Sequence, residues 1–400
     1  SGLPLVTVMQ ADTTAALTQH RLLLDGKTDT VTWEIPLLAE NAPDLFSDAS
    51  TNIELTQADW LKLNTTGVGH YVVNYTNPEH KKALAAQISD PVQSSSWKIT
   101  RINELVMLAR HGDTTLREAL EAIASSQEEP RAAVWSQIAG ILGSARMMIE
   151  GDESLEQQIK SFTYQLIETQ YKKLGWKYQE TEASNETHLR TTALALAISS
   201  EEPTVIKKAL ELYRATVNHE DLPAELRGIL MGTAVRHGQP AEFTQLVEVY
   251  QKATSADYKN DICAALTSTR VPENAQRLLD MMLDTNAIRP QDTIRWYIYL
   301  LRNRYTRHLA WQWLKTNWSW ILENFGGSKS YDDFARYTAS CFNTTDSLAQ
   351  YKAFFGTMQD DPALKRAITI GLEEIKARSQ WKLRDKKAVA SWLREYSRES

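Results

Sequence analysis

The sequence predicts a mostly α-helical protein, in which a small N-terminal β-sandwich precedes a large HEAT- or armadillo-like α-superhelical domain. Up to residue 75, apolar residues recur at every second position in short runs, which is typical of strands. From Asn77-Pro78 onward, the apolar period becomes that of amphipathic helices. We therefore place the β-sandwich at residues 1–78 and the superhelical domain at residues 79–400.

The chain has 400 residues, enough for two or three domains with a substantial core. Its 44 basic and 50 acidic residues give a formal net charge of −6, without the basic excess of a nucleic-acid-binding surface. No apolar run approaches the length of a membrane span. We therefore expect neither nucleic acid nor a membrane as partner.

Five segments before the change of period are predicted as strands: residues 3–9, 15–24, 30–38, 51–55 and 59–63. Pro4 lies near the start of the first, where a missing N–H costs least. Asp25-Gly26 follows the second as a hairpin-type turn. Many short strands separated by Gly, Pro and Asp favour a sandwich.

Residues 64–75 join the two parts of the chain and carry the last predicted strand. Gly67 and Gly69 can take positive φ without a Cβ clash, so they predict a tight turn. Tyr71, Val73 and Tyr75 alternate with Val72 and Asn74, and this period of two residues indicates a half-buried strand. We interpret this segment as an ordinary hairpin strand.

About sixteen helices of roughly 12–20 residues are predicted after residue 78. Thr115 and Glu118 form a capping box before one of them. Short connections predict that consecutive helices run antiparallel. No strict repeat period emerges, but sequential pairs fit a curved array better than one compact bundle. Several helices begin at or just after a proline, namely Pro130, Pro203, Pro223 and Pro272.

Charged and glycine residues mark helix termini. The segments from Arg110 to Gly112 and from Arg236 to Gly238 both predict a helix end, because the glycine can take the left-handed conformation. A cationic side chain in the last turn suits the negative end of the helix dipole. We interpret Asp332-Asp333 and Asp360-Asp361 as helix N-termini, where acidic residues are favoured.

No constellation of residues predicts catalysis or metal binding. The one His-Glu pair, His219-Glu220, has Pro223 where a zinc-helix motif needs its second histidine. The sequence has no Cys-x-x-Cys, no Walker loop and no Gly-x-Ser-x-Gly elbow. Cys263 and Cys341 are predicted to be unpaired thiols in helices. We expect no catalytic residue, no metal ligand and no cofactor in this chain.

The aromatic segment 296–325 is the densest feature of the sequence. On a single helix its tryptophans pair at a spacing of seven residues. Two interpretations stay open: packing between helix layers, and a stripe that anchors peptides. Just before them, Arg302 and Arg304 lie in a predicted loop, where an arginine can hold a carboxylate bidentately. The tryptophans concerned are Trp311, Trp313, Trp318 and Trp320.

Four segments carry a resemblance to one enzyme family, in the same order along the chain. They are the opening strand Gly2-Leu-Pro-Leu-Val-Thr-Val, the strand from Asn64 to Tyr75, the helix and turn from Arg101 to Gly112, and the helix Leu309-Ala-Trp-Gln-Trp-Leu-Lys-Thr-Asn-Trp318. The last is similar to a Leu-Ala-Trp-x-Phe-x-x-x-Asn-Trp helix. Together they make the chain resemble the C-terminal half of the zinc aminopeptidases of the aminopeptidase N and endoplasmic-reticulum aminopeptidase family.

The resemblance has departures. The family's strand reads Asn-x-x-x-x-Gly-Tyr-Tyr-Arg-Val-x-Tyr, but this chain has Val72 in place of the arginine and His70 in place of an aromatic residue. The family's His-Glu-x-x-His zinc helix and Gly-x-Met-Glu-Asn substrate loop occur nowhere in the sequence. The abrupt start at Ser1 fits a fragment of a longer chain.

The resemblance implies a β-sandwich and a helical domain that caps the catalytic cleft, encloses peptides and controls which lengths enter. It implies two substrate-binding residues, Arg302 and Arg146, of which Arg302 matches an arginine that contacts a substrate carboxylate. The implied partners are peptides and the N-terminal and catalytic domains of the same chain, and zinc is expected in the full-length enzyme. We expect a cytoplasmic location. The alternative is a free-standing α-solenoid scaffold that binds proteins.

Overall fold

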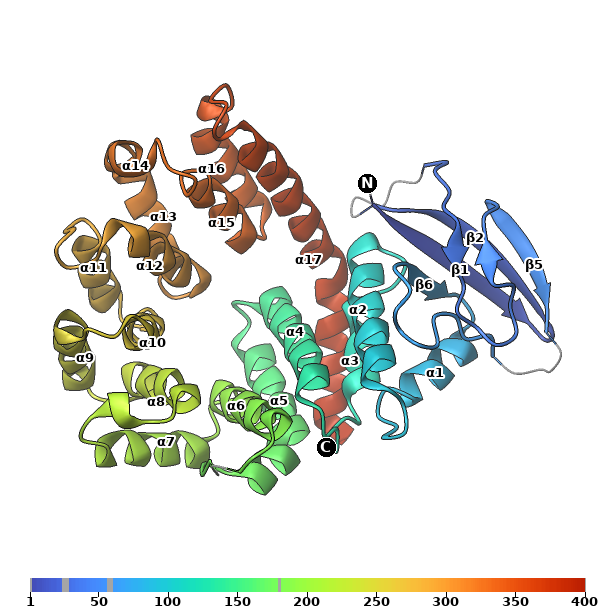
Figure 1. The fold of residues 1–400 in the computed structure, drawn as a ribbon, viewed down its shortest axis with the longest axis horizontal. Helices are drawn as coiled ribbons and strands as arrows, with labels where there is room; N and C mark the ends of the chain where they lie inside the picture. The colour runs from blue at the N-terminus through green and yellow to red at the C-terminus, as the bar shows by residue number, and fades with distance from the viewer. Residues whose placement is uncertain (1, 24–28, 56–59, 179–180, 400) are drawn as a thin grey trace. The chain divides into compact units, whose positions relative to one another are not determined.

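The computed structural model describes residues 2–23, 29–55, 60–178 and 181–399. They form a mostly helical chain with a small N-terminal β region, which confirms the predicted fold class (Figure 1). Contacts divide the chain into two compact units, one of Ser1–Ser200 with Gln380–Ser400 and one of Glu201–Ser379. The predicted boundary after residue 78 stays a prediction.

The first unit begins with a four-stranded sheet in the order β5-β2-β1-β6. Strands β1 (Leu3–Ala11) and β2 (Thr14–Leu22) form an antiparallel hairpin, and β5 (Ser50–Glu54) extends it beside β2. Strand β6 (Val72–Tyr75) lies on the other side of β1. Two further strands, β3 (Ile35–Pro36) and β4 (Leu45–Phe46), pair separately.

Two predictions about β6 are wrong. It runs parallel to β1, with Leu5 opposite Val72, so it is not a hairpin strand. All four of its residues are buried rather than half-buried. Helix α2 packs against it, and the side chains of Glu104 and Arg101 on that helix bind the N–H and C=O of Val73 at 3.0 and 3.1 Å. A strand covered on both faces needs no polar face.

The run predicted at 30–38 contributes only the two residues of β3. A side chain, and not a neighbouring strand, binds the backbone N–H and C=O of Trp33. Gln19 accepts a hydrogen bond from the Trp33 N–H at 2.8 Å and donates one to its carbonyl at 3.0 Å. In the described part of the 59–63 run there is no strand, and the N–H groups of Leu61 and Leu63 bind side chains instead. The Asp25-Gly26 turn, like residues 24 and 59, lies outside the described residues.

Among the described residues up to Ser200, six helices follow the strands of the first unit (Figure 1). Helix α4 packs against α2 and α6, while α5 packs against α6. This arrangement places alternate helices in one layer, as sequential antiparallel pairs require. The helices are α1 (Pro78–Ala86), α2 (Ser95–His111), α3 (Leu116–Ile123), α4 (Ala132–Ile149), α5 (Glu153–Leu174) and α6 (Ser184–Ser199).

The second unit continues the pattern, because α8 packs against α10 and α10 against α12. Proline occupies the first turn of α7, α9, α11 and α12, where its missing N–H has no helical partner anyway. The elements are α7 (Pro203–Ala215), η1 (His219–Asp221), α8 (Ala224–His237), α9 (Pro240–Lys252), α10 (Ala256–Leu266), α11 (Pro272–Met281), α12 (Pro290–Arg302), α13 (Arg307–Thr316), α14 (Trp318–Phe325), α15 (Asp333–Cys341), α16 (Thr345–Phe355), η2 (Gly356–Met358) and α17 (Lys365–Glu399), whose last residues belong to the first unit.

Two predictions about helix termini are wrong. Thr115 makes no side-chain cap, so the predicted capping box is absent. Gly112 has φ +114°, as predicted, but Gly238 has φ −86°. The Glu242 carboxylate reaches back to the Gln239 N–H, and a Cβ on Gly238 would collide with it. Close approach, not left-handed backbone, therefore requires that glycine.

Two of the four tryptophans pack in the core, as the first interpretation predicts, while Trp318 and Trp320 are half-buried. Trp311 is 2% and Trp313 5% exposed, and both contact other rings. The predicted single helix is in fact two, α13 and α14, which meet at Asn317. Trp313 and Trp320 do pair, with ring centroids 6.3 Å apart. Cys263 and Cys341 are both free thiols, as predicted.

Candidate functional site

Arg302 lines an open hollow of about 410 Å³ in the second unit. The ends of α8, α10 and α12 and the loops that follow the last two surround it, and Figure 1 shows these three helices beside one another. Three arginines and no carboxylate are among its described lining residues. These are Arg236, Ala264, Thr267, Ser268, Arg270, Tyr299, Arg302, Asn303 and Tyr305.

A side chain fixes the end of α12 at this hollow. Asn303, directly after the helix, donates hydrogen bonds from Nδ2 to the carbonyls of Thr267 at 3.0 Å and Thr269 at 2.7 Å. These bonds hold Arg302, the last helical residue, beside the loop that follows α10. The Arg302 side chain itself is exposed, so it is free to meet a ligand.

Arg236 supplies a partly buried cation of the hollow. Its Nε donates to the Gly232 carbonyl at 3.1 Å, one turn back on α8. The pKa of Arg236 is lowered to about 10, mainly by burial and also by repulsion from Arg270, while Glu201 acts in the opposite direction. The guanidinium stays protonated at neutral pH, yet its environment disfavours the charge. An anionic ligand would relieve that cost.

Arg270 and Tyr305 complete the site. Arg270 forms an ion pair with Glu201 and lies over the Tyr305 ring, 5.1 Å from its centroid. On the same ring, Arg304 lies 4.7 Å from the centroid and donates to the phenol oxygen at 2.9 Å. The tyrosine is thus held by two cations. Because positive charge exceeds negative charge here, the arrangement suits a carboxylate beside an apolar group.

Arg146, the second arginine named from the sequence, lies on α4 in the first unit. Its Nη2 donates to Thr163 Oγ1 on α5 at 3.2 Å, which joins two neighbouring helices. Sequence reasoning did not identify Arg236 and Arg270 as site residues. The only signal was the triplet that ends at Gly238, which marks a helix end and says nothing of what the helix end faces.

No set of three metal-ligating side chains is gathered within the part of the chain that the structure describes. His219 of the incomplete zinc motif stacks on Tyr213, with ring centroids 4.2 Å apart, and its Nε2 lies 2.9 Å from the Tyr213 carbonyl. Within the same described residues, no helix has both the length and the hydropathy to cross a membrane.

Comparison with known proteins gives one consistent family. The family described as ERAP1-like C-terminal domain matches residues 60–377. Aminopeptidase N of Lactococcus lactis subsp. cremoris is 27% identical over 393 residues, which are 94% of this chain and 46% of the relative. Aminopeptidase N of Lactobacillus helveticus is 26% identical over 94% and 46%, and glutamyl aminopeptidase of Rattus norvegicus 26% over 98% and 43%. The chain spans about half the length of these relatives.

Proposed function

The chain belongs to the family of ERAP1-like C-terminal domains, and on that premise we propose that it is the non-catalytic C-terminal region of an aminopeptidase N-type zinc metallopeptidase. The match to about half of each relative supports this proposal, as does the lack of a zinc motif in the sequence. In this proposal the helical region caps the active-site cleft and controls which peptides enter, and at what length. A free-standing scaffold is not favoured, because relatives named as aminopeptidases match nearly the whole chain.

The partners proposed are the catalytic and N-terminal parts of the same enzyme, which would hold the zinc, and peptide substrates. Zinc there would activate a water molecule for attack on the peptide bond. We extend the proposal to a cytoplasmic location, where the two free thiols, Cys263 and Cys341, would stay reduced.

The observation that carries the substrate role is the arginine-lined hollow. A peptide ends in a carboxylate, and a guanidinium binds a carboxylate with two parallel hydrogen bonds. Arg302 would make that contact, while the partly buried Arg236 would add favourable charge. The rings of Tyr299 and Tyr305 would contact the last side chain of the peptide. Arg146 remains a proposed second peptide contact.

The test is peptide binding to the 400-residue chain, measured by fluorescence anisotropy. We expect Arg302→Ala to weaken binding of a free-carboxylate peptide about tenfold, the loss of one charge-assisted hydrogen-bonded contact. Binding of the same peptide with a C-terminal amide should change little. In an enzyme that includes the catalytic part, the same substitution should raise KM for peptides more than for single-residue amides.

Arg277→Ala is the matched control, since Arg277 is an exposed arginine of α11 outside the hollow. It should leave both affinities unchanged. An equal loss for the acid and the amide in Arg302→Ala would contradict a carboxylate contact.

A further inference from the structure

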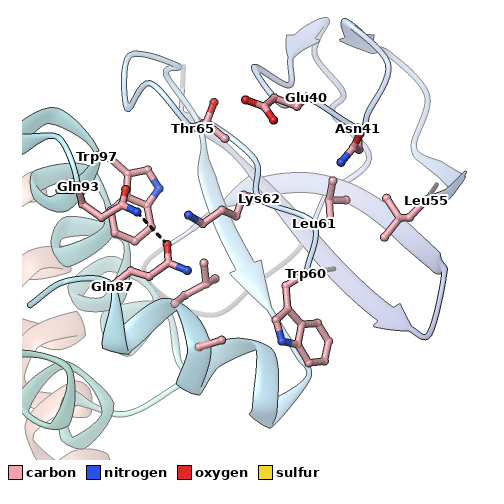
Figure 2. Close-up of a pocket in the computed structure, with 12 residues that line it drawn as sticks. Glu40, Asn41, Leu55, Trp60, Leu61, Lys62, Thr65, Gln87, Gln93 and Trp97 are labelled. Atoms are coloured by element: carbon pink, nitrogen blue, oxygen red, sulfur yellow. Dashed lines mark hydrogen bonds between the residues drawn. The ribbon is translucent and has the colours of Figure 1, made fainter. Parts of the chain in front are cut away.

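A second cavity, of about 490 Å³, lies in the first unit and shares no residue with the arginine-lined hollow. Figure 2 shows it between helix α1, the start of α2, and the segments around residues 40 and 62. Its size is that of a small-molecule site. Its lining combines two opposite charges, three amides and two indoles: Glu40, Asn41, Leu55, Trp60, Leu61, Lys62, Thr65, Ala83, Leu84, Gln87, Gln93 and Trp97.

Lys62 is the cation of this cavity. Its Nζ lies 5.2 Å from the ring centroid of Trp97. Burial lowers the pKa of Lys62, although the carboxylates of Asp90 and Glu40 act in the opposite direction. The ammonium is therefore incompletely compensated by the charges around it, and an additional anion would stabilise it.

Amide groups stand beside the lysine. Gln93 donates from Nε2 to Gln87 Oε1 at 3.4 Å, which orients the Gln87 amide. Arg131 Nη1 donates to the backbone carbonyl of Gln93 at 2.6 Å, which fixes the position of that residue. Figure 2 shows Lys62, Gln87, Gln93 and Trp97 near one another, with Glu40 and Asn41 on a separate loop. At one end of the cavity, Lys62 and the glutamine amides can donate hydrogen bonds to the carboxylate of a ligand. The separate loop carries the carboxylate of Glu40.

The walls are apolar and fixed. Trp97 is 5% exposed, and Leu61 and Leu84 are buried beside it. Trp60 stacks on the buried ring of His80, with centroids 4.8 Å apart and planes 15° from parallel. These side chains provide a rigid surface for an aliphatic or aromatic group.

Hydrogen bonds pre-organise the segment that carries Lys62. The N–H groups of Leu61 and Leu63 bind Gln10 Oε1 and Tyr75 Oη at 2.8 and 3.0 Å. Thr65 N–H binds the carbonyl of Leu38 at 3.0 Å, which ties this segment to the loop that carries Glu40. Because little ordering remains for a ligand to impose, a small molecule can bind with modest contact area.

We propose that this cavity binds a small zwitterion, a free α-amino acid or a dipeptide with an apolar side chain. The carboxylate contacts Lys62 and the Gln87 amide, the ammonium faces Glu40, and the side chain lies against Trp60 and Trp97. A simple anion would be repelled by Glu40 and a simple amine by Lys62, whereas a zwitterion satisfies both. The proposal is independent of the peptide contact at Arg302.

The test is calorimetric titration of the 400-residue chain with four probes: leucine, dileucine, leucinamide and 4-methylpentanoate. We expect leucine or dileucine to bind, and whichever binds more tightly identifies the source of the zwitterion. Leucinamide lacks the carboxylate and 4-methylpentanoate the ammonium, so each should bind about tenfold more weakly or worse.

Two variants assign the charges. Lys62→Met should weaken the zwitterion about tenfold but should not weaken leucinamide, which Lys62 repels. Glu40→Gln should also weaken the zwitterion but should not weaken 4-methylpentanoate, which Glu40 repels. Lys82→Met is the control, because Lys82 is an exposed lysine of α1 that does not line this cavity. Circular dichroism checks that each variant keeps the fold.

Three results would overturn the proposal. One is equal affinity for leucine and leucinamide. Another is no heat with any probe up to about 10 mM, beyond the range of a specific site. The third is zwitterion binding that survives Lys62→Met and is lost in Arg302→Ala, which would move the ligand to the arginine-lined hollow.

Discussion

Gly67 shows how much one residue can decide in this fold. Its φ is +68°, in the left-handed region, and a Cβ there would lie 2.6 Å from the carbonyl carbon and oxygen of Ser96. Its own carbonyl accepts hydrogen bonds from Ser96 Oγ at 3.2 Å and Thr100 Oγ1 at 2.9 Å. The turn before β6 is thereby fixed to the first turns of α2. Gly69, also predicted at positive φ, is not among the residues that adopt it.

We expect Gly67→Ala to destabilise the chain by about 2–4 kcal/mol, because it adds left-handed strain to a backbone collision. Urea unfolding followed by circular dichroism measures the change. Gly140→Ala is the control: Gly140 lies within α4 and nothing lies within 4 Å of an added Cβ. That variant should be more stable by about 0.5–1 kcal/mol. Similar effects at both positions would contradict the role assigned to Gly67.

Buried charges near β6 are a second residue-scale feature. Glu104 is almost fully buried, and burial raises its pKa, while Arg101 opposes the rise through an ion pair at 3.0 Å. Both side chains bind the backbone of Val73. The sequence has Val72 where the family has an arginine. In the structure, the polar partners of β6 come from α2, about thirty residues later in the chain.

At the scale of elements, helix α3 is capped from far away in the sequence. The Leu116 N–H donates to Asp385 Oδ2 at 2.8 Å, and Trp381 Nε1 donates to the same oxygen at 2.9 Å. Asp385 is fully buried and also accepts from Arg384 Nε at 3.0 Å. The end of α17 therefore replaces the capping box that Thr115 was predicted to form.

Asp385→Ala should cost about 3 kcal/mol, since it leaves a helix N–H, an indole N–H and a guanidinium without their acceptor. Thr115→Ala should change stability by less than about 0.5 kcal/mol, because that side chain makes no cap. Thermal unfolding of the two variants side by side measures the difference. A larger loss in Thr115→Ala than in Asp385→Ala would show that local capping, and not α17, stabilises the start of α3.

At the scale of the whole molecule, the proposal that this chain is a non-catalytic region makes a direct prediction. The purified 400-residue chain should carry far less than one zinc per molecule and should not hydrolyse aminoacyl-arylamides, because its sequence lacks a zinc-helix motif. Metal analysis by mass spectrometry and a chromogenic assay provide the two readouts. Tightly bound stoichiometric zinc, or robust turnover, would refute the non-catalytic assignment.

The helical part of the fold was predictable because its signals are local. The signals are apolar spacing, prolines in first turns and the glycine after His111, and each depends only on residues that are close in the sequence. The strands were less predictable, since pairing depends on distant partners. Parallel pairing of β6 with β1, and the side-chain bonds that Gln19 makes to Trp33, join residues that no local pattern connects.

For the candidate site, the sequence identified Arg302 but not its surroundings. Arg236 and Arg270 lie more than thirty residues away in the chain and reach the same hollow only because α8, α10 and α12 stack. Lys62 and Glu40 likewise line one cavity, in which the hydrogen bond from Thr65 to Leu38 ties their two segments together.

The sequence by itself determined the helical class, the small β region at the start, the absence of a zinc motif and the resemblance to a family. These follow from short-range periodicity and from contiguous motifs. Only the tertiary structure decided strand direction, the cap on α3 and the charge of the two cavities. Each of these requires polar or charged groups from distant segments to be buried together, and burial is a property of the folded chain.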